Sequence, residues 1–205
     1  MIDILRSSQE LLKFFVKIGG VLYVNSVEPI RDINKLEDIV SYFKNKNQRN
    51  YIMFMIGLYT GLRISDILKL QVKHVRGRDY IRLKEEKTDK SKVIKLNKLL
   101  KKELELYVED MEDFQYLIPN SKSGLNPISR QHAYKIINDT CSIFGLESIG
   151  THSMRKTFGY HYYLKTKDTA VLQNIFNHSD PSITLKYIGI NQDTISSAYE
   201  SMSYF

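Results

Sequence analysis

The feature that most constrains the fold is an almost uninterrupted apolar stretch, residues 51–59, which is followed by Thr60 and Gly61. A helix that is apolar all round has no face to offer to water, so it must be buried inside the protein. Glycine readily adopts the left-handed backbone conformation that ends many helices. The sequence therefore predicts a buried helix that stops at Gly61, with other segments packed around it.

The composition is typical of a folded domain with an acidic partner. Of the 205 residues, 42% are hydrophobic and 26% are charged, which predicts a single domain with a sizeable core. The formal net charge of +7 at pH 7 favours a polyanionic partner, without indicating any particular chemistry. Cys141 is the single cysteine, so an internal disulfide and a thiolate zinc cluster are excluded, and its apolar neighbours predict a core position.

The rest of the chain is mainly patterned as helices. Residues 1–29 are expected to form an appendage or the remnant of a linker, with a helix over residues 8–18, a break at Gly19 and Gly20, and an extended piece over residues 21–24. Residues 30–205 are expected to form one domain. Its predicted helices cover residues 34–49, 51–61, 65–70, 99–111, 129–144, 152–165, 169–176, 182–188 and 193–202.

One segment departs from the helical pattern. Between residues 72 and 96 the period changes to alternation, and three short strands are predicted around Val72 and Val75, at residues 80–83, and at residues 93–96. The expected fold class is therefore α+β and mostly helical, with a small three-stranded antiparallel sheet on one edge. We find no signal peptide and no apolar run long enough to cross a bilayer, so the cytoplasm is the expected compartment.

Reactive side chains gather in the last third of the chain. His152 and Arg155 are three residues apart and would share one helix face, and His178 and Tyr187 follow. Together they supply a cation, two imidazoles and a phenol, which could bind phosphate, transfer protons and attack as a nucleophile. Taken alone, a His-x-x-Arg pair is more often a surface feature, and the tyrosine is one of 14.

Two cations lie earlier in the chain. Arg63 follows the predicted end of the buried helix, where an arginine could either point into a site or cap the preceding carbonyl groups. Lys87 lies in a charged hairpin tip, which could be a solvated turn or could bring a proton donor into a site. No metal-ligand spacing, glycine-rich phosphate loop or Gly-x-Ser-x-Gly elbow is present in the sequence.

In order and spacing, this set resembles the tyrosine recombinases, also called the phage integrase family. The resemblance covers roughly residues 30–205. It is carried by the box Thr60-Gly61-Leu62-Arg63-Ile64-Ser65-Asp66, by Lys87, by the box His152-Ser153-Met154-Arg155-Lys156-Thr157, by Asn177-His178-Ser179, and by Tyr187 nine positions after His178.

The resemblance implies the tyrosine-recombinase catalytic-domain fold and a reaction on DNA that needs no metal or nucleotide cofactor. It implies that Tyr187 attacks the scissile phosphate to form a 3′-phosphotyrosyl link, while Arg63 and Arg155 hold the phosphate oxygens. By the same resemblance, Lys87 protonates the leaving 5′-oxygen. His152 then assists proton handling, and His178 donates a hydrogen bond to the phosphate.

The partners that the resemblance implies are double-stranded DNA, further copies of the chain in a tetramer, and an accessory DNA-bending protein. The tail at residues 190–205 would dock on a neighbouring copy through Ile195, Ala198, Tyr199 and Met202. Two features depart from the family pattern: only about thirty residues precede the catalytic region, where a DNA-clamping domain is common, and Ser153 with Met154 replaces a frequent acidic-apolar pair. The alternative function is a DNA-binding regulator that keeps the fold but no longer cuts.

Overall fold

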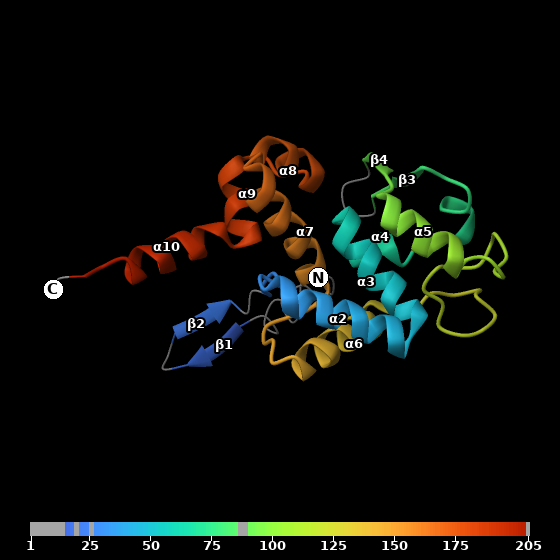
Figure 1. Ribbon diagram of the computed structural model, residues 1–205, viewed down its shortest axis with the longest axis horizontal. Coiled ribbons are helices and arrows are strands. Elements are labelled where there is room, and N and C mark those ends of the chain that lie inside the picture. Colours follow the sequence, from blue (N-terminus) through green and yellow to red (C-terminus); the bar gives the residue numbers. More distant parts are fainter. Residues whose placement is uncertain (1–14, 19–20, 25–26, 86–89, 204–205) are drawn as a thin grey trace, which may run out of the picture.

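The structure is a computed structural model that describes residues 15–18, 21–24, 27–85 and 90–203 (Figure 1). The described elements follow the order β1 (Phe15–Ile18), β2 (Val21–Val24), α2 (Ile33–Lys46), α3 (Gln48–Thr60), α4 (Ile64–Ile67), a 3-10 turn η1 (Val72–His74), β3 (Tyr80–Lys84), β4 (Ser91–Lys95), α5 (Lys98–Tyr107), α6 (Arg130–Ile143), α7 (Thr151–Thr166), α8 (Thr169–Phe176), α9 (Pro181–Ile188) and α10 (Ile190–Glu200). These elements confirm the predicted fold class, which is α+β and mostly helical.

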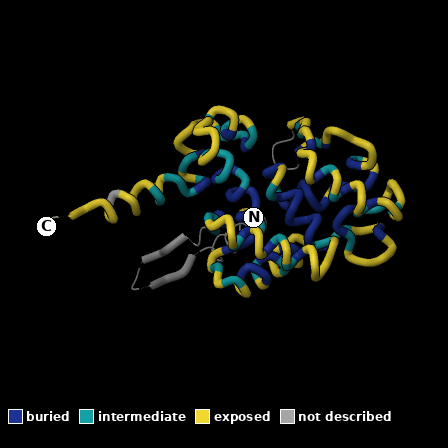
Figure 2. The backbone as a smooth tube through the Cα atoms, viewed as in Figure 1, coloured by how far each residue is buried: buried dark blue, intermediate teal, exposed yellow. Residues whose placement is uncertain are grey.

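Helix α3 is the centre of the main core, as the sequence predicts. Its residues from Tyr51 to Gly57 are all buried, and α2, α5 and α7 pack around it (Figure 2). At the crossing with α7 the two backbones come close, because a Cβ added to Gly57 would lie 2.6 Å from the sulfur of Met154. This close approach holds α7, and with it Arg155, against the end of α3.

The end of α3 is also as predicted. Gly61 adopts the left-handed conformation, with φ 62° and ψ 20°, and its N–H donates to the carbonyl oxygen of Gly57. The chain then turns at once into the short helix α4, whose N-cap residue is Arg63. The glycine therefore decides where Arg63 enters the structure.

The predicted three-stranded sheet is wrong in one strand. Among the described residues, β3 pairs only with β4, antiparallel, with Ile81 opposite Ile94. Val72 and Val75 belong instead to the 3-10 turn η1 and its C-cap, and both are buried. Residues three apart lie on one side of a 3-10 helix, so this turn buries both valines as well as a strand would.

The expectation of a helix over residues 8–18 is corrected where it can be compared. Phe15–Ile18 is a strand that pairs with Val21–Val24, with Phe15 opposite Val24, whereas the earlier part lies outside the described residues. Valine, isoleucine and phenylalanine prefer strands, and pairing with a partner of the same composition overrides the helical spacing of the apolar residues. The predicted extended piece at residues 21–24 is confirmed.

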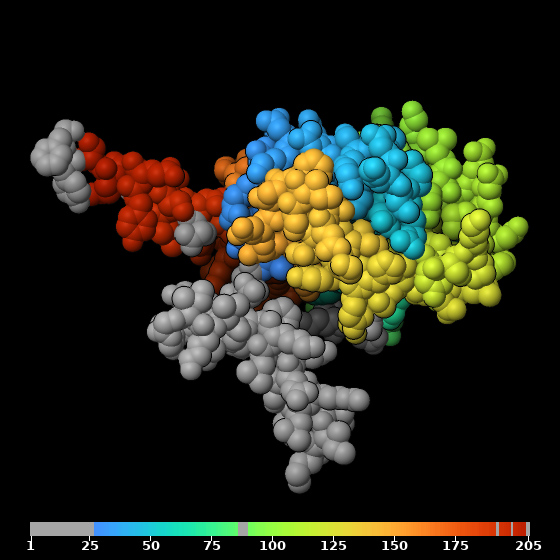
Figure 3. Space-filling view, turned by 90° about the horizontal axis from the view of Figure 1, so that it is seen from below, coloured from blue at the N-terminus to red at the C-terminus, as the bar shows by residue number. Residues whose placement is uncertain are grey.

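The C-terminal helices build a second, smaller core. Helices α8 and α9 pack on α7 around Tyr160, Leu172, Phe176 and Ile188. Helix α10 then extends away from the body, as Figures 1 and 3 show, and Tyr199 is 79% exposed on it. No described helix is both long and apolar enough to cross a membrane.

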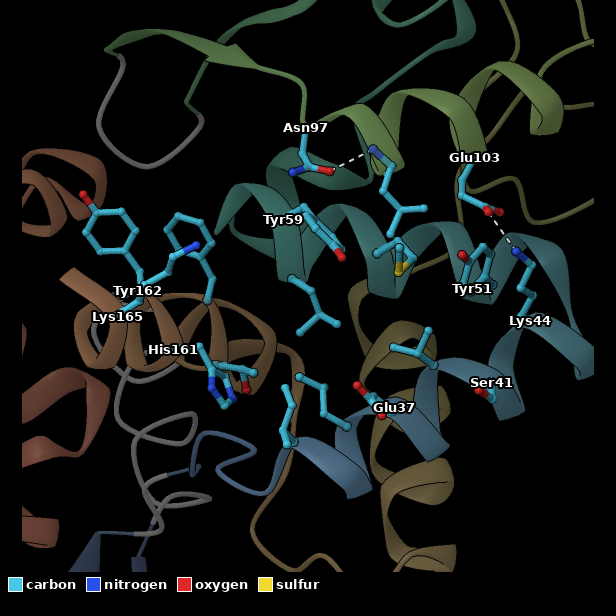
Figure 4. A pocket seen from close by; sticks show the side chains of 18 residues that line it. Glu37, Ser41, Lys44, Tyr51, Tyr59, Asn97, Glu103, His161, Tyr162 and Lys165 are labelled. Atoms are coloured by element: carbon cyan, nitrogen blue, oxygen red, sulfur yellow. Dashed lines mark hydrogen bonds and ion pairs between the residues drawn. The ribbon is translucent and has the colours of Figure 1, made fainter.

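A groove of about 850 Å³ runs between α2, α3, α5 and α7 (Figure 4). Most of its lining is apolar, and Ile33 and Leu99 remain half exposed beside it. The ion pair between Lys44 and Glu103, 2.8 Å long, lies at one end. The groove is thus open to solvent and lies between helices that form the main core.

Candidate active site

Arg155 lies at the junction of the two cores. It is 2% exposed on α7 and donates one hydrogen bond to the carbonyl oxygen of Gly61 and another, 3.2 Å long, to that of Phe176. Its guanidinium carbon is 4.4 Å from the centre of the Phe176 ring. The end of α3 is therefore capped by Arg155, and not by Arg63, and the same side chain fastens the end of α8 to it.

Arg63 lies beside this junction at the start of α4. Its side chain is 15% exposed, and its NH1 group donates to Oε2 of Glu85 over 3.0 Å. Within the described part of the chain, this is the hydrogen bond that its side chain makes, so other N–H groups can donate to a further acceptor. A guanidinium in this state is suited to a phosphate, which accepts two parallel hydrogen bonds from arginine.

Tyr187 and His178 face each other next to the two arginines. Their ring centres are 5.2 Å apart. The ring centre of Tyr187 is also 5.4 Å from that of Phe176, and the two rings are in an edge-to-face arrangement. His178 shares a 2.9 Å hydrogen bond between its Nδ1 and the hydroxyl of Thr184 on α9. Lys156, one residue after Arg155, places its Nζ 5.3 Å from the centre of the Tyr187 ring.

Burial and positive charge act against each other on these groups. Burial raises the pKa of Tyr187 above its ordinary value, while the guanidinium groups of Arg155 and then Arg63 act to lower it. Burial, followed by the same two cations, lowers the pKa of His178. At neutral pH the tyrosine is thus a phenol and the histidine a neutral imidazole, both in a positive electrostatic environment.

This arrangement brings together Arg63, Arg155, His178 and Tyr187 from three separate parts of the chain. Comparison with known proteins shows the family of the chain. Residues 31–193 match the model of the phage integrase family. The chain belongs to this family. It is thereby assigned to the tyrosine-type site-specific DNA recombinases. The probable integrase/recombinase YoeC of Bacillus subtilis strain 168 is 48% identical over 174 residues, which cover 85% of this chain and 96% of that protein.

Other members of the phage integrase family are longer. A tyrosine recombinase of Pseudothermotoga lettingae is 26% identical over 154 residues, covering 72% of this chain and 52% of its own. The XerH recombinase, solved with its palindromic difH substrate in a post-cleavage complex, shares the fold with a TM-score of 0.66 at 20% identity, covering 86% of this chain and 54% of that one. This chain spans about half the length of these two proteins.

His152 and Lys87 are the other two residues expected in the site of this integrase-family chain. His152 is exposed in the first turn of α7, one turn before the buried Arg155 on the same helix. Lys87 lies outside the described residues.

Cys141 is in the core as expected, where burial raises its pKa to about 12. Within the described ranges, no three histidine, cysteine, aspartate or glutamate side chains come together as metal ligands.

Two charged residues at this junction, Glu85 and Lys92, were not singled out from the sequence. Glu85, with a fully buried carboxylate, binds Arg63 through Oε2 and Lys92 through Oε1, the latter over 3.1 Å. Asn177 adds a 2.8 Å hydrogen bond to Oε2. In the sequence, Glu85 stands in a run of charges typical of an exposed hairpin tip, so no local signal indicates that it is buried.

Proposed function

We propose that this chain cleaves and rejoins DNA strands through a 3′-phosphotyrosyl intermediate on Tyr187, and that residues 30–205 are its catalytic domain. The observation that carries the proposal is the half-buried Tyr187 beside the guanidinium groups of Arg155 and Arg63, whose charges act on its hydroxyl. A phenol is a weak nucleophile at neutral pH, and two fixed cations stabilise both its phenolate and the phosphate that it attacks.

In the proposed step, the phenolic oxygen of Tyr187 forms a bond to phosphorus and the bond from phosphorus to the 5′-oxygen breaks. The phenol passes its proton to solvent water with the assistance of His152 as it attacks, and the leaving 5′-oxygen gains one from Lys87. Arg63 and Arg155 neutralise the charge that builds up on the non-bridging oxygens. Rejoining reverses these events with the 5′-hydroxyl of another strand, so the bond energy stays in the protein–DNA ester.

The two histidines have separate proposed roles. His178 donates a hydrogen bond to a phosphate oxygen through Nε2, which fits the engagement of its Nδ1 with Thr184. His152 assists proton handling at the edge of the site, from its exposed position on α7. Both roles rest on the family resemblance, and each can be tested by substitution with asparagine, which keeps a hydrogen-bonding group but cannot take up a proton.

We also propose that the chain works on DNA as a tetramer in which the tail of one copy docks on the next. Support comes from α10, which leaves the body and exposes Ile195 and Tyr199 to solvent, as does the segment after it with Met202. Apolar side chains on a projecting helix are typical of a segment that is covered in an assembly. An accessory DNA-bending protein is the further partner that we expect at a recombination site.

The decisive experiment is covalent capture from a pool of nicked duplexes with randomised sequence on both sides of the nick. Cleavage releases the short piece of DNA between the cleavage position and the nick, which carries the new 5′-hydroxyl. Because this piece diffuses away, rejoining stops and the protein–DNA ester accumulates. The ester is covalent, so it survives denaturant. Wild-type protein should retain a set of related sequences, and Tyr187→Phe should retain none. If wild type binds particular duplexes and forms no ester with any of them, the regulator alternative replaces the enzyme.

A further inference from the structure

A buried ionic cluster lies under the proposed phosphate-binding arginine. Its centre is Glu85, which directly follows strand β3 and whose N–H donates to the carbonyl oxygen of Lys90. The carboxylate contacts Arg63 at 3.0 Å, Lys92 at 3.1 Å and the amide of Asn177 at 2.8 Å. Lys92 also donates to the carbonyl oxygen of Ile175 over 2.6 Å.

Arg63, Lys92 and Asn177, the partners of Glu85 among the described residues, come from three segments that surround the proposed site. Arg63 begins α4, Lys92 lies on β4, and Asn177 is the C-cap residue of α8, directly before His178. One carboxylate therefore ties the hairpin and the end of α8 to the arginine. The relative positions of the hairpin, α8 and Arg63 depend on the Glu85 carboxylate, since Oε2 binds Arg63 and Asn177 whereas Oε1 binds Lys92.

We propose that Glu85 is a positioning residue for DNA cleavage, which holds Arg63 and Lys92 so that their remaining N–H groups face the scissile phosphate. The inference rests on the proposed function and deepens it. Toward the described residues, Arg63 uses NH1 for Glu85, and Lys92 uses one N–H for Glu85 and another for Ile175, so further N–H groups of both can donate to a phosphate.

Charge balance supports this role. Arg63, Arg155 and Lys92 converge here: Arg63 and Arg155 both act against the ionised state of Lys92, and Arg63 also acts against that of Arg155. A single carboxylate reduces this repulsion but leaves the cluster positive, which favours a phosphodiester anion. Burial lowers the pKa of Lys92, and the nearby Glu85 acts in the opposite direction, so the carboxylate helps keep the lysine charged.

Burial also shows on which side of Arg63 the carboxylate lies. The Glu85 side chain is 0% exposed, whereas those of Arg63 and Lys92 are 15% and 16% exposed. A DNA phosphate arrives from solvent, so it meets the two cations first and Glu85 stays behind them. The carboxylate therefore supports the binding groups and does not occupy the place of the phosphate.

The test compares Glu85→Gln with Glu103→Gln, using the duplex recovered by covalent capture with wild-type protein. Both changes replace an ion-paired carboxylate by an amide of equal size, but Glu103 pairs with Lys44, outside the ionic cluster. We expect Glu85→Gln to bind this duplex and to form the ester about 10- to 100-fold more slowly, because small misplacements of catalytic groups have effects of that size. Glu103→Gln should react at the wild-type rate.

The pH profile supplies a readout that a loss of stability would not move. The charged groups acting on Lys92 are Glu85, Arg155 and Arg63, so removing the one carboxylate lowers the pKa of Lys92 further. The decline of the ester-forming rate at alkaline pH should then begin at lower pH in Glu85→Gln than in wild type. In a Lys92→Met background, Glu85→Gln should no longer cause this shift.

Several results would overturn the inference. Glu85→Gln that forms the ester at the wild-type rate shows that no positioning is needed, and a faster rate shows that the carboxylate competes with the phosphate. Should Glu85→Gln fail to fold, Lys92→Met is measured alone: a rate about tenfold below wild type supports the inference, and an unchanged rate overturns it. Failure of wild type to form any ester contradicts the proposed function instead.

Discussion

Arg155→Lys is the substitution that best separates support of the fold from catalysis. Arg155 reaches the carbonyl oxygens of Gly61 and Phe176 through two different nitrogens. A lysine keeps the charge, but its single nitrogen can reach only one of these two positions. The other carbonyl group is then left buried without a donor, and the flat stacking on Phe176 is lost.

The expected magnitudes follow from these contacts. An unsatisfied buried acceptor costs ~2 kcal/mol of unfolding free energy, and in a chain of this size that corresponds to a melting temperature lower by roughly 4–8 °C. The rate of ester formation should fall about 100-fold or more, as when one donor to a developing oxyanion is removed. Urea unfolding gives the first quantity, and single-turnover capture on the recovered duplex gives the second.

Arg76→Lys is the matched control. Arg76 also donates to two backbone carbonyl oxygens, those of Val108 and Met111, and it pairs with Asp113 at the protein surface, outside the candidate site. We expect a loss of stability in this variant with no change in the rate of ester formation. If Arg155→Lys loses stability and yet reacts at the wild-type rate, Arg155 serves the fold alone and the proposed role is refuted.

Four further predictions concern single groups. Tyr187→Phe should abolish the ester while unfolding in urea close to wild type, and an ester in this variant would mean that another residue is the nucleophile. Lys87→Ala should react slowly with ordinary DNA and recover in part with a 5′-thiolate leaving group, which needs no acid; equal loss on both substrates contradicts its role. Because the folded-state pKa values of His178 and His74 are lowered from 6.5, the unfolded chain binds more protons below that pH. Stability should therefore fall as the pH drops below 6.5, and His178→Asn should reduce this fall in urea titrations. Deleting residues 195–205 keeps the Arg31–Asp193 ion pair and should leave unfolding and single-site binding intact while weakening assembly on paired sites in sedimentation experiments; loss of the folded domain would show that the tail packs in its own core.

Much of the fold could be predicted because its signals are local. An apolar stretch with Gly61 at its end specifies a buried helix and its stop, and the apolar pattern of residues 169–176 marks α8 with the bounds that the structure has. The order and spacing of Arg63, Arg155, His178 and Tyr187 likewise indicate one family. Helix bounds and motif spacing can both be read from the order of residues along the chain, without knowledge of their tertiary contacts.

Tertiary structure decided what depends on distant partners. Val72 and Val75 suit a strand or a 3-10 turn equally well, and burial against the core chose the turn. Phe15–Ile18 became a strand because a matching segment pairs with it. Glu85 belongs to a run of charges that looks solvated in sequence, and only the convergence of Arg63, Lys92 and Asn177 offsets the cost of burying its carboxylate. Residue types and spacing thus identify the family and its chemical groups, whereas the environment of each group is set by contacts between segments far apart in the chain.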